Sequence, residues 1–310
     1  MPLTTYDELG SGVQKGAGSI REDLLDFIEN LSPVDTPLFN NLTQIGVNAG
    51  FVEFLEDTLP AAAVNAFTEG AAATDQTLGS PSRNAAIVQC FQKHFWIAGR
   101  QDAVNHAGMA STTSYQRMKA AKNLKNDIEL ALHRGSAVSG TTSVAPQFNG
   151  LLNGSLSGMT ASSGTTLTER VYNDIVTLAY AFSLNPRQVY ANMLVKRTIS
   201  GFSTNVQRFI EAGAKKQLNV IDVYESEQGM QEIIKSRYQL QAASVTSQGN
   251  SWVAIDPDYF NVGILRPVRE SPLGKDGDRD RYLMVGDLTL VIRARGAGFG
   301  ATGHVANLSA

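Results

Sequence analysis

The residues that come nearest to a known chemical motif are the glycines of GAGFGA at positions 296–301. Glycines at this spacing bind a dinucleotide when they follow a strand and open a helix, because the helix N-terminus then faces the pyrophosphate. Only nine residues follow Ala301, which is too few for the strand-helix-strand unit that this chemistry needs. The sequence therefore favours a tail that packs closely through small residues, and a dinucleotide-binding enzyme remains a remote alternative.

Metal and hydrolase chemistry have no better support. Asp276, Asp278 and Asp280 alternate as calcium ligands do, but Arg281 stands where a calcium loop needs glycine, so a solvated hairpin tip is favoured. The four histidines lack the short spacings of a zinc site: His94, His106, His133 and His304. No Gly-x-Ser-x-Gly elbow and no phosphate loop occurs. We expect no catalytic residue, no cofactor and no metal.

Composition is that of an ordinary folded protein of about two compact units. The 310 residues are 43% hydrophobic and 18% charged, and 26 basic against 29 acidic residues give a net charge of −3. This balance disfavours sequence-specific DNA binding. No apolar run approaches a membrane span, no signal peptide is evident, and the single cysteine, Cys90, is expected to pack inside a strand, so we expect a cytoplasmic protein that binds no membrane.

Three helices are predicted from apolar residues at helical spacing. The first covers residues 20–31 and ends at the prolines that follow it. The second covers about 113–134, carries Lys119, Lys122, Lys125, Asn126 and Glu129 on its polar face, and stops at Gly135. We interpret these lysines as a solvated face. The third follows a Gly-, Ser- and Thr-rich boundary at 135–165 and begins at a capping box formed by Thr166 and Glu169.

The rest of the second half mixes strand and helix. RQVYANML at 187–194 is predicted as a strand, followed by a helical stretch at about 195–212. NVIDVYES, MQEIIKSRYQL and SWVAID read as further strands, and VGILRPVRE with RYLMVGDLTLVIRAR reads as a hairpin around a charged tip. The fold class is therefore α+β.

A long arm interrupts this pattern in the first half. The strand-like runs FVEFLEDTL and NAAIVQCFQKHFWIAG are joined by a segment of small and polar residues at 60–83, which has little apolar surface to bury. A two-stranded arm of this kind is stable only against another molecule, which indicates an assembly device. A mobile surface loop is the alternative that composition leaves open.

The order of these parts resembles the major capsid proteins of tailed bacteriophages with the Hong Kong 97 type fold. ENLSPVDTPLFNNL, FVEFLEDTL, Glu69-Gly70, SRNAAIVQCFQKHFWIAGRQDAV and YQRMKAAKNLKNDIELALHRG resemble one subfamily long catalogued as a domain of unknown function. That likeness covers about residues 20–150, and IDPDYFNVGILRP extends it more loosely into the second half. An arginine and an acidic residue that this family often has are replaced by Ala145-Pro146-Gln147 and Thr112-Thr113-Ser114, which puts subfamily contacts in doubt.

The resemblance implies an order of domains: an N-terminal arm and short helix at 1–50, an extended E-loop hairpin at 51–99, a peripheral domain with the spine helix at 100–159, an axial domain with a central mixed sheet at 160–260, and a return to the peripheral domain with a C-terminal hairpin and tail at 261–310. It also implies a structural protein that forms hexamers and pentamers of an icosahedral head around double-stranded DNA. Such a capsid would assemble in the host cytoplasm, with only nonspecific contact to DNA.

Further expectations follow for the partners and contacts of such a shell. Residues 51–92 contain no lysine, which disfavours covalent cross-linking through the E-loop. The short N-terminal arm leaves no room for a fused scaffolding domain, so we expect a separate scaffolding protein or none, and portal and cement proteins are further candidate partners. Candidates for contacts between subunits are Glu69, Arg83, Arg100 and Asp102, because the arm is otherwise poor in charge, and solvated surface charges are the alternative for each of them. An encapsulin-like cellular compartment, which would load an enzyme, is the alternative shell.

Overall fold

The computed structural model describes most of the chain beyond the N-terminal segment. The described residues are 35–57, 59, 62–64, 66–70, 72, 79–104, 111–154, 167–181, 185–202, 222–226, 229–239, 250–275, 277–293 and 301–305. The helix predicted at 20–31 lies outside them. Three sheets organise the described residues, of four, five and two strands.

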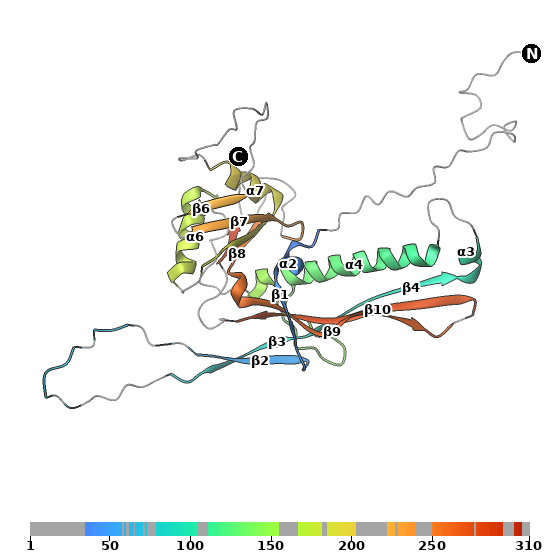
Figure 1. Ribbon diagram of the computed structural model, residues 1–310, viewed down its shortest axis with the longest axis horizontal. Helices are drawn as coiled ribbons and strands as arrows, with labels where there is room; N and C mark the ends of the chain where they lie inside the picture. The colour runs from blue at the N-terminus through green and yellow to red at the C-terminus, as the bar shows by residue number, and fades with distance from the viewer. Residues whose placement is uncertain are drawn as a thin grey trace, which may run out of the picture.

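The molecule is elongated, with the two-stranded sheet and helix α3 (Gly99–Ala103) toward opposite ends (Figure 1). Helix α4 (Thr112–Arg134) lies along one face of the four-stranded sheet, which is ordered β1-β9-β10-β4. Its strands are β1 (Thr43–Gly46), β4 (Gln89–Ala98), β9 (Phe260–Leu273) and β10 (Arg279–Ile292). The predicted C-terminal hairpin is present as β9 and β10, which pair antiparallel.

Local sequence signals explain the bounds of α4. The side chain of Ser111 caps its start by accepting a hydrogen bond from the backbone N–H of Ser114, and Gly135 follows its last residue. Leu124, Ile128 and Leu132 are buried toward the core. A buried leucine contributes about 1.5–3 kcal/mol, so this apolar stripe holds the helix on the sheet. The helix predicted at about 113–134 is therefore confirmed.

The five-stranded sheet belongs to the second half of the chain and is ordered β11-β8-β5-β7-β6. Its strands are β5 (Gln188–Ala191), β6 (Val223–Ser226), β7 (Gly229–Lys235), β8 (Asn250–Ile255) and β11 (Ala301–Val305). The β5–β7 pair is parallel and the other pairs are antiparallel, so the sheet is mixed. Helices α6 (Glu169–Ala181) and α7 (Met193–Ser200) accompany it, and the ring of Tyr172 from α6 stacks on Trp252 of β8.

Several local predictions differ from the structure in their bounds. The strand expected at 187–194 ends at Ala191, because the side chain of Asn192 accepts a hydrogen bond from the N–H of Val195 and caps α7. The cap of α6 is Thr168 rather than Thr166, since the N–H of Val171 donates to the Thr168 hydroxyl. The helix predicted at about 195–212 ends at Ser200, where Gly201 follows as its C-cap, and residues 203–212 lie outside the described residues.

Pro37 opens the short helix α2 (Pro37–Asn41), where its missing N–H costs nothing, and Thr36 before it is not helical. Cys90 was expected to be packed in the interior, but its position on β4 leaves it exposed. Surrounding protein atoms and the carboxylate of Asp287 nevertheless raise the pKa of its thiol.

The predicted E-loop is only partly a hairpin. Strand β2 (Phe51–Glu56) pairs with β3 (Ser82–Ile87), whereas the chain beyond Val88 forms β4 and pairs with β10. Strands β3 and β4, which together contain most of the run NAAIVQCFQKHFWIAG, thus belong to two different sheets. The reason is that the second half of this run carries the apolar residues that face α4. The division of the chain into domains stays a prediction.

Candidate assembly surface

The two-stranded sheet exposes apolar side chains on an arm with few contacts to the rest of the subunit. Leu55 is 68% exposed and Phe51 is 54% exposed, although both lie in β2. Residues at alternate positions share one face of a strand, so these two side chains and Glu53 lie together. Arg83 of β3 forms an exposed ion pair with Glu53, at 3.3 Å between Nη1 and Oε2. This face combines apolar surface with one weak surface pair.

The connection between β2 and β3 extends the same exposure. The larger apolar residues that the structure describes there are almost entirely uncovered: Leu59 at 94%, Val64 at 96% and Phe67 at 81%. Glu69 is exposed beside Gly70, whose φ of +81° is the left-handed conformation that glycine adopts without strain. Large apolar groups that the subunit leaves in water mark a surface that another molecule covers.

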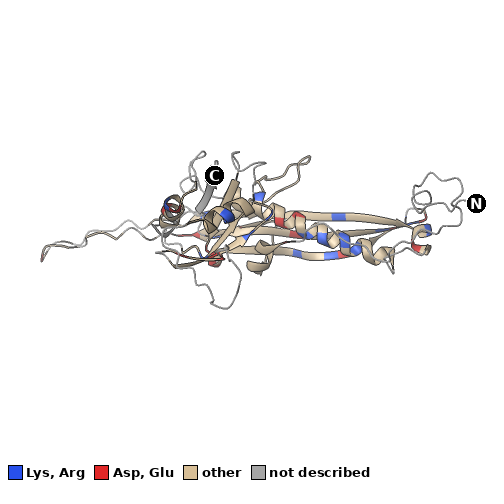
Figure 2. Cartoon of the chain, turned by 90° about the horizontal axis from the view of Figure 1, so that it is seen from above, with Lys and Arg blue, Asp and Glu red and all other residues tan. Residues whose placement is uncertain are grey.

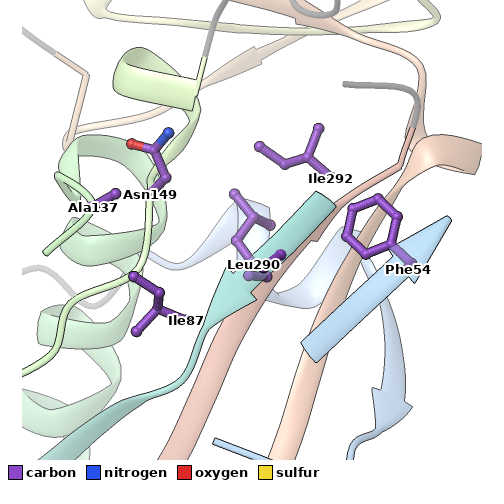
Figure 3. A pocket seen from close by; sticks show the side chains of 8 residues that line it. Phe54, Ile87, Ala137, Asn149, Leu290 and Ile292 are labelled. Carbon is purple, nitrogen blue, oxygen red and sulfur yellow. The ribbon is translucent and has the colours of Figure 1, made fainter. Parts of the chain in front are cut away.

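The base of the hairpin is joined firmly to the four-stranded sheet. The N–H of Val88 donates to the carbonyl of Gly50 at 2.9 Å and closes the hairpin at its base. The hydroxyl of Thr289 on β10 donates to the carbonyl of Ile87 at 2.6 Å and ties this base to the four-stranded sheet. Beside this joint lies a cavity of about 40 Å³ (Figure 3), lined by Phe54, Ala85, Ala86, Ile87, Ala137, Asn149, Leu290 and Ile292. The cavity is mostly apolar, and the joint fixes the direction in which the arm leaves the subunit.

The end of the molecule remote from the arm carries two other predicted contact residues. Arg100 is exposed on α3, and the carboxylate of Asp102 accepts a hydrogen bond from the hydroxyl of Thr113 at 3.1 Å. Nearby, Trp96 is half exposed and lies under the guanidinium of Arg279, at 5.3 Å from its ring centre. The structure therefore separates Arg100 and Asp102 from Arg83 and does not gather the predicted residues into one site. Their roles between subunits stay predictions.

A buried polar cluster joins helix α2 to helix α4. Glu129 was expected on the polar face of its helix, but it is fully buried. Its carboxylate accepts hydrogen bonds from the N–H groups of Leu38 at 2.8 Å and Phe39 at 3.0 Å, which belong to the first turn of α2. Its Oε1 also lies 3.3 Å from Nε2 of His133. Glu129 is buried because α2 covers this face of α4 and offers the carboxylate N–H groups that have no partner within their own helix.

His133 extends the cluster to the five-stranded sheet. Its Nε2 lies 2.9 Å from the hydroxyl of Ser236, and its Nδ1 lies 3.1 Å from the amide nitrogen of Gln239. The hydroxyl of Ser251 on β8 donates to Gln239 at 2.8 Å. Three parts of the chain thus meet in one network that sequence reasoning missed. The available signal was the spacing of Glu129 and His133, four residues apart on one helix face.

Arg134 closes this junction on its outer side. Its guanidinium donates to the carbonyls of Tyr238 and Gln239 at 2.6 and 2.7 Å. Partial burial lowers the pKa of this guanidinium. The junction is therefore a structural clamp between α4 and the segment after β7.

Within the described part of the chain, neither a metal site nor a membrane-spanning helix is found. No group of three or more His, Cys, Asp or Glu side chains is placed there to hold a metal ion. Among the same residues, no helix has the length and apolarity to cross a membrane. The glycines at 296–300 lie outside the described residues, and β11 begins at Ala301, so the next described element is a strand rather than the helix of a dinucleotide site.

Solved capsid structures have a fold similar to that of this chain. The chain is similar in structure to the capsid asymmetric unit of Cyanophage A-1(L), with a TM-score of 0.70 and 13% identity over 94% of this chain and 98% of that chain. The capsid of the native GTA particle has a TM-score of 0.65 and 11% identity, over 97% of this chain and 100% of that chain. Microbacterium phage Oxtober96 has a TM-score of 0.64 and 14% identity, over 92% of this chain and 96% of that chain. A search of curated proteins by sequence finds no match.

These structures share the Hong Kong 97 type fold, which confirms the predicted fold class. The sequence itself matches the profile of the family described as SU10 major capsid protein over residues 4–303, nearly the whole chain. The chain therefore belongs to the SU10 major capsid protein family and is a major capsid protein of a tailed phage.

Proposed function

We propose that copies of this subunit form hexamers and pentamers, which close an icosahedral head around double-stranded DNA, and that each arm of β2 and β3 lies across a neighbouring subunit. The observation that carries this proposal is the exposure of Phe51, Leu55, Val64 and Phe67 on the arm formed by β2, β3 and their connection, whose base is tied to β10. Burying such side chains yields about 1.5–3 kcal/mol each, and a shell repeats the gain in every subunit.

Backbone groups support the same arrangement. In the described part of the chain, β2 and β3 pair only with each other, so their outer edges have no strand partner. Edges of this kind are covered in stable proteins, and a neighbouring subunit can cover them. Glu69 and Arg83 on the arm, with Arg100 and Asp102 at the other end, are our candidates for polar contacts across these interfaces.

The proposal extends to partners. We expect assembly in the host cytoplasm with a separate scaffolding protein or none, with portal and cement proteins as candidate partners, and with only nonspecific contact with the DNA. The encapsulin alternative is not favoured, because the family is that of a phage capsid protein.

Light scattering and electron microscopy test assembly directly. The protein would be purified after expression alone and after expression with its neighbouring genes. Closed shells, tubes, or rings of five or six subunits would support the proposal. A monomer under both conditions would contradict it.

A second expectation concerns covalent bonds in the mature shell. The arm from 51 to 92 contains no lysine, and the amine of Lys93 is engaged at 2.5 Å from the carboxylate of Asp127 on α4. We predict that mature particles dissolve into single chains on denaturing gels. A ladder of covalent multimers would contradict this prediction, and a Lys93→Arg variant would show whether that amine forms the bond.

A further inference from the structure

Three lysines lie on the exposed side of α4. Lys119 and Lys125 are exposed and Lys122 is half-buried, while Leu124 and Ile128 of the same helix face the core. Figure 2 shows basic residues along this helix when the molecule is seen from above. We call the three residues the α4 lysine stripe.

The acidic residues of α4 are already engaged elsewhere. Asp127 pairs with Lys93 of β4, and Glu129 accepts the N–H groups of α2 inside the core. Arg117, two residues before the stripe, pairs with Glu270 of β9. Within the described ranges no ion pair involves a lysine of the stripe. The stripe therefore presents three positive charges that no ion pair among the described residues neutralises.

Helix geometry places these charges close together. At a rise of about 1.5 Å per residue, each lysine is about 4.5 Å further along the axis than the one before, and the three spread over about a third of the circumference. Duplex DNA carries one negative charge per about 1.7 Å of its axis, so a single short stretch of backbone reaches all three ammonium groups.

We propose that the α4 lysine stripe binds the phosphate backbone of duplex DNA, so that this face of α4 is turned toward the interior of the shell. The inference rests on the proposed function, and it names the residues of a DNA contact that net charge alone did not suggest. Lysine suits the role because its ammonium is a compact, strongly hydrated charge that attracts phosphate without reading bases. Such contacts hold DNA weakly and let it move during filling of the head.

The test compares unassembled full-length subunits of two charge-matched variants. In the stripe variant, Lys119, Lys122 and Lys125 are replaced with glutamine, which has a helix propensity close to that of lysine. In the control variant, the exposed basic residues Arg197, Lys235 and Arg237 of the second half are replaced with glutamine. Both variants lose three positive charges, so a difference between them reports position rather than net charge.

The readout is binding to a short DNA duplex of random sequence, followed by fluorescence anisotropy over a range of salt concentrations. Each phosphate contact contributes about 0.9 to the slope of log affinity against log salt, so the stripe variant is expected to lower that slope by about 2.7 while the control keeps it. No DNA binding by the wild-type protein, an unchanged slope in the stripe variant, or an equal loss in both variants would overturn the inference.

Two further outcomes separate this inference from others. If the stripe variant loses binding to polyglutamate but not to DNA, the partner is an acidic protein segment and the inference fails. Assembly is measured independently by electron microscopy. Subunits that bind DNA through the stripe yet never form shells would overturn the proposed function and leave the DNA contact standing.

Discussion

Replacement of Glu129 with alanine is expected to lower the free energy of unfolding by about 3–5 kcal/mol, the usual cost of removing one partner from a buried polar pair. The N–H groups of Leu38 and Phe39 would lose their acceptor inside the core, and the ring of His133 would lose one neighbour. Unsatisfied buried groups of this kind are costly because water cannot replace the lost bond. We also expect α2 to separate from α4, since this carboxylate is its polar anchor.

Urea unfolding followed by tryptophan fluorescence measures the change, and limited proteolysis after residue 34 measures release of α2. Asp127→Ala on the same helix is the matched control: its side chain is 46% exposed, and an exposed ion pair is worth about 0–1 kcal/mol. Glu129→Gln keeps one acceptor and should recover part of the loss. Equal stability of Glu129→Ala and Asp127→Ala would show that the cluster does not hold the junction.

Replacement of Leu55 with aspartate is expected to weaken shell formation at least tenfold while the subunit stays folded. Leu55 is 68% exposed, so the subunit loses little by the change. In a shell, however, the arm would forfeit about 1.5–3 kcal/mol of apolar burial and would place a carboxylate in the interface. Because about 1.4 kcal/mol corresponds to a factor of ten in an equilibrium constant, the protein concentration needed for assembly should rise at least tenfold. Phe51→Asp on the same face should act in the same direction.

Sedimentation and electron microscopy measure the assembled fraction over a range of concentrations, and urea unfolding confirms that the subunit is intact. Met230→Asp is the control, because Met230 has a similar exposure of 66% but lies on β7, outside the arm. Normal shells from Leu55→Asp would show that the arm does not carry the contact. Loss of shells in all three variants would show a general intolerance of added charge.

Local patterns in the sequence determined most elements of this protein. The bounds of α4 follow from its apolar spacing, from Ser111 before it and from Gly135 after it. The hairpin of β9 and β10 follows from two strand-like runs around a charged tip. Residues that make a helix or hairpin are neighbours in the chain, so their types and spacing suffice to predict it.

Tertiary structure alone decided which distant segments meet. Glu129 was placed on a solvated face, yet it binds α2, which lies 91 residues earlier in the chain. Likewise, the run after Val88 was assigned to the arm, although β4 joins the four-stranded sheet beside β10. In both cases the local pattern is compatible with exposure or burial. The physical reason is that burial depends on which surface covers a residue, and that surface comes from segments far away in the sequence.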